Sequence, residues 1–168
     1  MSITMYTATV PTCTRALNSL VAILEKASAH AEARKVAPAT LLGTRLYPDM
    51  LPLSMQIQLA NDSARSGAAR LAGVEVPTVE AKERGFAEWI SATRDTIAFI
   101  GSLKPAQFEG SEDKTVSWQS RSSTKSMQGT PYLFHHVLPN VFFHVTTAYD
   151  ILRQTGLEIG KADYLGKA

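Results

Sequence analysis

Cysteine is almost absent from the sequence, since Cys13 is the only one in 168 residues, and no disulfide can form within the chain. The N-terminal segment also lacks the basic start and apolar run that a secretory signal needs. No apolar stretch approaches the roughly 20 residues that a membrane-spanning helix requires. These absences argue against a secreted or membrane-embedded protein, so we expect a cytoplasmic protein with no membrane partner.

An excess of one charge is lacking as well. The chain carries 17 basic and 15 acidic residues, scattered along its length, for a net charge of +2. No basic patch indicates a polyanion, so we expect no nucleic-acid partner. With 45% hydrophobic and 19% charged residues the composition is typical of globular proteins, and we expect residues 1–168 to form one domain.

Four segments carry apolar residues at alternating three- and four-residue steps, which is the period of an amphipathic helix. Asp49 and Thr78 are the predicted N-caps of the second and third helices. The predicted helices cover approximately residues 10–31, 49–73, 78–101 and 130–156. The sequence therefore predicts an all-α fold, an antiparallel four-helix bundle. We expect six residues to share its core: Leu20, Leu24, Ile57, Ile97, Leu138 and Val145.

Between the third and fourth helices the apolar period changes. Residues 114–129 alternate polar and apolar positions around Val116 and Trp118, with a serine-rich middle. This pattern predicts a small hairpin or an irregular excursion. An isolated two-stranded hairpin is only marginally stable, so we expect it to lean on the helices.

The segment "YLFHHVLPNVFFHVTTAYDIL", residues 132–152, holds three of the four histidines. Its apolar stripe is predicted to run through Phe134, Leu138, Val141, Val145, Ala148 and Leu152. His136, Asn140 and His144 follow one another at four-residue steps and share one side of the helix. His136 and His144 are two turns apart, roughly 12 Å, so they cannot both reach one ion on a straight helix. Pro139 predicts a kink that frees a backbone carbonyl.

The second helix has a narrow stripe of small residues, so Gln56 and Asp62 could line a cavity beside it. Together with His136, Asn140 and His144, they form the predicted polar pocket. We expect His144 to face inward near Gln56 and to join a hydrogen-bonded polar cluster rather than a coordinated ion. His135 and His136 are expected to point toward solvent or the mouth of the cleft. No nucleophilic triad, phosphate loop or CxxC motif is present.

Three phrases, "RLYPDMLPLSMQIQLANDSAR", "ARLAGVEVPT" and "LPNVFFHVTTAYDILRQTGLEIGKADYLG", resemble the bacterial proteins grouped as domain of unknown function 1993. That family is similar in fold to the DinB/YfiT-like superfamily, which implies a DinB-like four-helix bundle. Superfamily relatives include metal-dependent thiol transferases and thiol-dependent isomerases, in which a second-helix His and a His-x-x-x-His pair hold a divalent ion. At those positions this chain has Gln56, Asn140 and His144, so only His144 matches a ligand.

Two interpretations stay open. The first is a small-molecule-binding or enzymatic bundle around Gln56, Asn140 and His144, with a metal-dependent, thiol-dependent transferase or isomerase as its enzymatic form. The second is a binding or interaction protein without catalysis, which a cavity plugged by Trp89, Phe142 and Phe143 would favour. A divalent ion is thus a conceivable cofactor and a small molecule a conceivable ligand. We also expect a homodimer, since two-fold dimers are the commonest oligomers.

Overall fold

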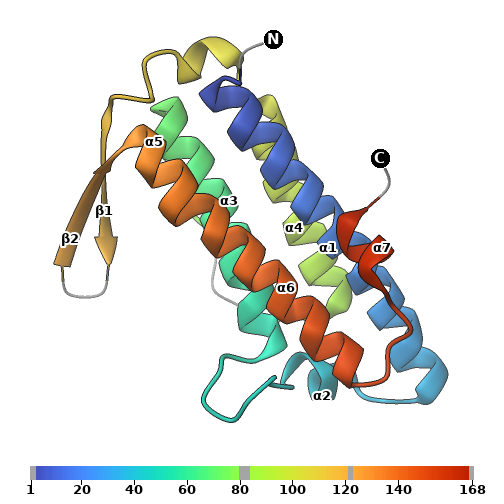
Figure 1. The fold of residues 1–168 in the computed structure, drawn as a ribbon. Helices are drawn as coiled ribbons and strands as arrows, with labels where there is room; N and C mark the ends of the chain where they lie inside the picture. Colours follow the sequence, from blue (N-terminus) through green and yellow to red (C-terminus); the bar gives the residue numbers. More distant parts are fainter. Residues whose placement is uncertain (1–2, 80–83, 121–122, 167–168) are drawn as a thin grey trace.

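The computed structural model describes residues 3–79, 84–120 and 123–166, and its fold is mostly helical (Figure 1). Four long helices in these ranges lie side by side: α1 (Met5–Arg34), α3 (Leu53–Ala72), α4 (Phe86–Ser102) and α6 (Leu138–Gln154). Helix α3 packs against α4 and α6, and α1 packs against the same two helices. No helix in the described ranges has the length and apolar character needed to cross a membrane.

Several short elements connect the long helices or follow the last of them. They are α2 (Pro38–Leu42), the 3-10 helix η1 (Pro105–Phe108), β1 (Thr115–Ser120), β2 (Ser123–Gln128), α5 (Gly129–Tyr132), the π-helical η2 (Leu133–Val137) and α7 (Lys161–Leu165). The strands pair antiparallel, with Val116 opposite Met127. This sheet confirms the predicted hairpin and corrects a strictly all-α description. Val116 and Trp118 are buried while every residue of β2 is exposed, so one strand anchors the hairpin on the helices.

The hydrophobic cluster between the long helices contains most of the residues expected at its centre. Four of the six are at most 1% exposed: Leu20, Leu24, Ile57 and Val145. Ile97 and Leu138 are only partly buried and pack against the cluster from its edge. The helical period therefore located the buried faces, with errors of one position at the margins.

Both predicted N-caps are wrong. Asp49 lies in a turn, and α3 begins only at Leu53, because proline at position 52 disfavours helical backbone in Leu51. Helix α4 begins at Phe86 rather than near Thr78. Its N-cap is residue 85, whose N–H donates to Glu88 Oε2 at 3.0 Å. Residues 80–83, which belong to the predicted third helix, lie outside the described residues.

The last helical run is not one regular α-helix. Elements α5, η2 and α6 follow one another directly, and the N–H of Leu138 donates to the carbonyl of Leu133, five residues back. This wider turn stands just before Pro139, whose ring would clash with a carbonyl four residues back in an α-helix. As a result Leu133 and Val137 are buried, whereas Phe134, predicted to start the buried stripe, is 45% exposed.

Candidate functional site

His144 and Gln56 connect α6 to α3. The His144 ring is half-buried, and its Nδ1 lies 2.8 Å from Oε1 of Gln56, which is 2% exposed. The amide nitrogen of Gln56 donates to the Leu51 carbonyl at 3.0 Å, so its oxygen is free to accept from Nδ1–H of His144. The expected inward histidine is therefore confirmed. Burial lowers the pKa of His144 and favours the neutral ring, with Nε2 as its acceptor.

The other three predicted pocket residues, Asp62, His136 and Asn140, line a separate cleft. This α3–α6 cleft has a volume of approximately 210 Å³ and lies between α3, β1 and the run from α5 to α6. Neither Gln56 nor His144 belongs to its lining. The five predicted pocket residues thus form two groups: Gln56 and His144 are hydrogen-bonded to each other, and the other three line the cleft.

An aromatic stack forms one wall of the α3–α6 cleft. The ring centroid of His136 lies 4.6 Å from that of Trp118 and 5.4 Å from that of Tyr132. Arg70 donates to the Tyr132 hydroxyl at 3.1 Å, and Nδ2 of Asn140 donates to the His136 carbonyl at 2.6 Å. Burial lowers the pKa of His136, and the positive charges of Arg70 and Lys125 lower it further. The wall therefore presents a neutral imidazole beside the rings of Trp118 and Tyr132, which also contact each other, next to a guanidinium.

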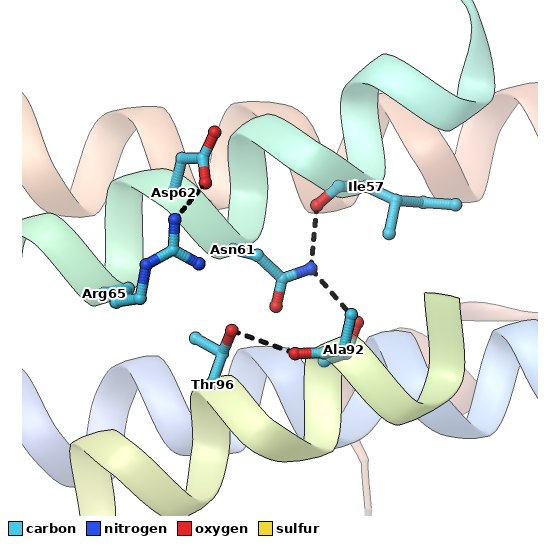
Figure 2. Close-up of polar contacts among 7 residues, drawn as sticks. Ile57, Asn61, Asp62, Arg65, Ala92 and Thr96 are labelled. Atoms are coloured by element: carbon cyan, nitrogen blue, oxygen red, sulfur yellow. Dashed lines mark hydrogen bonds and ion pairs between the residues drawn. The ribbon is translucent and has the colours of Figure 1, made fainter. Parts of the chain in front are cut away.

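A larger cavity of approximately 720 Å³, which we call the α3–α4 cavity, was not predicted from the sequence. Figure 2 shows Asn61 and Arg65 on α3 beside Thr96 of α4. Nδ2 of Asn61 donates to the Ile57 carbonyl at 2.9 Å and to Thr93 Oγ1 at 3.0 Å. The available signal was the spacing of two polar side chains, Asn61 and Arg65, one turn apart in the alanine-rich middle of α3.

Two further residues bear on the chemistry of these sites. Cys13 is fully buried, and burial raises the pKa of its thiol to about 12, so it is a core residue and not a nucleophile. Phe142 and Phe143 are 39% and 55% exposed, so they do not plug a cavity.

The family model described as Domain of unknown function (DUF1993) matches residues 5–165. The chain belongs to the DUF1993 family. The crystal structure of a DinB family member protein from Shewanella denitrificans is similar, with a TM-score of 0.90 and 36% sequence identity over 97% of this chain and 92% of that chain. No curated protein matches the sequence. These findings confirm the family and the DinB-like resemblance, and they assign no activity.

Gln56, Asn140 and His144 are the residues of this DUF1993 protein that the resemblance set against metal ligands. The first and last are bonded to each other, and the amide of Asn140 donates to a backbone carbonyl. Within the described ranges, no three His, Cys, Asp or Glu residues are grouped so that they could hold a metal ion. A neutral amide is also a poor ligand for zinc or nickel. These donor atoms do not fit a tightly held divalent ion.

Proposed function

We propose that this DinB-like four-helix bundle binds a small polar organic molecule in the α3–α6 cleft, without a tightly held metal. The observation that carries the proposal is the convergence of Asp62, Arg70 and Asn140 on the contacting rings of Trp118 and His136. Binding sites for small molecules typically combine apolar or aromatic walls with a few polar groups that fix orientation. Here the rings offer a face for stacking, and the polar groups offer both donors and acceptors.

The size of the cleft limits the ligand. Its 210 Å³ corresponds to about seven water molecules at roughly 30 Å³ each. A monosaccharide, an amino acid or a small thiol is of the right order, whereas a polymer could insert only one unit.

Fluorescence of Trp118 tests this proposal. The chain has two tryptophans, so the Trp89→Phe variant isolates the signal of Trp118. We expect at least one member of a panel of monosaccharides, amino acids and small thiols to quench it saturably. Asn140→Ala should weaken that binding, while Asn18→Ala, at an exposed position on α1, should not. A panel with no saturable quenching, or equal effects of both variants, would contradict the proposal.

A metal-dependent, thiol-dependent transferase or isomerase is the second candidate. It is favoured by one observation: hydrogen bonding of Nδ1 to Gln56 leaves Nε2 of neutral His144 as an acceptor. Elemental analysis of protein purified without a histidine tag separates the two candidates. We expect far less than one zinc, nickel or manganese ion per chain. A stoichiometric metal that is lost in His144→Ala would establish the second candidate instead.

A further inference from the structure

Three buried polar atoms without hydrogen-bond partners belong to residues that line the α3–α4 cavity. They are Oδ1 of Asn61, Nε of Arg65 and Nε1 of Trp89. Their residues are only 4%, 9% and 5% exposed. Buried polar groups in native proteins are nearly always paired, so three such atoms around one cavity call for a physical reason.

These atoms are concentrated in this one place. Within the described residues, a single other side-chain atom is buried without a partner, Oγ1 of Thr14 on α1. Other polar atoms of Asn61 and Arg65 do have partners: Nδ2 of Asn61 makes two hydrogen bonds, and Nη2 of Arg65 contacts Asp62 Oδ1 at 2.5 Å (Figure 2). The side chains are therefore held in place by these contacts, while one atom of each is left for another partner.

The types of these atoms define the chemistry of that partner. Arg65 Nε–H and Trp89 Nε1–H are donors and require an acceptor, whereas Asn61 Oδ1 is an acceptor and requires a donor. Asn61 and Arg65 stand one turn apart on α3, so their side chains lie next to each other. The partner must therefore carry an acceptor and a donor close together.

The charge of the cavity favours a neutral partner. Its described lining includes three acidic and three arginine side chains: Asp62, Glu88, Asp95, Arg65, Arg70 and Arg84. The guanidinium of Arg65 is already paired with Asp62, so it does not call for an anion. Val76, Val79 and Phe99 give the cavity an apolar side as well.

We propose that the α3–α4 cavity, which shares Asp62 and Arg70 with the α3–α6 cleft, is a second binding site, for a neutral carboxamide or lactam with an apolar body. Its carbonyl oxygen accepts from Nε–H of Arg65 and Nε1–H of Trp89, and its N–H donates to Oδ1 of Asn61. The apolar body lies against Phe99 and the segment at residues 76–79.

Nuclear magnetic resonance of the full-length protein tests this site directly. The indole N–H signals of the two tryptophans are assigned with Trp89→Phe, and benzamide is titrated as the probe. Benzoate, benzylamine and toluene serve as matched compounds that share the ring but lack the neutral donor–acceptor pair. We expect a saturable shift of the Trp89 signal with benzamide, and affinity at least about tenfold weaker for the other three compounds. The Trp118 signal reports the other cleft and should not follow the titration.

Variants then connect the binding to the unpaired atoms. Asn61→Leu removes the unpaired Oδ1 together with the bonded Nδ2, and Arg65→Lys removes the unpaired Nε. Each should weaken benzamide binding by about fivefold or more. Arg65→Lys keeps a cation beside Asp62, so it carries the test if Asn61→Leu does not fold. Asn18→Leu, at an exposed position of α1, is the control and should bind as the wild type does.

Three results would overturn the proposal. Benzamide could leave the Trp89 signal unmoved, or all four compounds could bind equally well, which would indicate an unspecific apolar surface. Benzamide binding that survives in Arg65→Lys would show that the unpaired Nε atom is not used.

Discussion

His144 couples the stability of this protein to pH, because burial lowers the pKa of its ring in the folded state. An unfolded histidine titrates near ~6.5, so below that pH the unfolded chain binds more protons than the folded one. His136 acts in the same direction. We therefore expect the free energy of unfolding to fall as pH drops from about 6.5 toward the lowered folded-state pKa values. Urea midpoints between pH 8 and pH 5 measure this loss.

Two histidine variants test whether His144 causes this pH dependence. His144→Gln should make the loss of stability on acidification shallower, because the titrating ring is gone. His135→Gln, which changes an exposed ring on the same helical run, should leave it as in the wild type. Identical slopes in the two variants would show that His144 does not contribute.

The His144–Gln56 hydrogen bond can be measured as a coupling energy. Gln56→Leu leaves Nδ1 of His144 without its partner, which should cost about 1–3 kcal/mol. The double variant Gln56→Leu/His144→Leu should be less destabilised than the sum of the single variants, because neither member of this pair then remains without the other. Urea denaturation at pH 7.5 gives the four free energies. Strict additivity would mean that the 2.8 Å contact contributes nothing.

Sequence reasoning at the residue scale found the pair but not the cleft. Gln56 and His144 both border an apolar stripe, and bordering positions on packed helices tend to meet. The contact of the His136 ring with Trp118 depends on where the hairpin packs, which no local pattern encodes. The α3–α4 cavity was missed for a similar reason: a hydropathy pattern cannot show which atoms of Asn61, Arg65 or Trp89 lack partners after packing.

At the scale of elements, the close approach of α3 to the π-helical segment depends on Gly67. A Cβ atom at Gly67 would overlap Cγ1 of Val137 and lie 2.8 Å from its Cγ2. We expect Gly67→Ala to cost about 1–3 kcal/mol, since the helices must separate to admit the methyl group. Thermal or urea denaturation measures this.

The matched control is Gly101→Ala in α4, where an added Cβ meets no atom within 4 Å. Its stability should stay within about 0.5 kcal/mol of the wild type or rise, because alanine is the better helix former. Equal losses in both variants would indicate a general cost of replacing glycine rather than a tight contact with Val137.

Helices and strands were predictable where the hydrophobic period of the sequence is regular. They were not predictable where that period is interrupted. The hairpin follows from the alternation around Val116 and Trp118, and the buried faces of α1 and α3 follow from their three- and four-residue steps. The exposure of Phe134 could not be read in this way, because the wider turn before Pro139 changes which residues of the run face the core. At such a turn, the period of a straight α-helix assigns the wrong residues to the buried face.

At the scale of the whole molecule, helix α6 and the turn before it expose three large aromatic residues, Phe134, Phe142 and Phe143. Exposed aromatic side chains of this kind are typical of surfaces that meet a partner. We propose a homodimer that covers this face, in line with the commonest oligomeric symmetry. None of these three residues belongs to the hydrophobic cluster between the helices, so pairing would not disturb it.

Light scattering at several concentrations tests the dimer. We expect a mass of about 36 kDa, twice the 18.2 kDa of one chain. Phe143→Ser should weaken the association by about tenfold or more, because it removes a large apolar contact from the centre of the proposed face. Tyr47→Ser is the control, since Tyr47 is 66% exposed but belongs to the segment before α3 and not to α6 or the turn before it. A mass of 18.2 kDa at every concentration would reject the dimer, and equal effects of both variants would place its interface elsewhere.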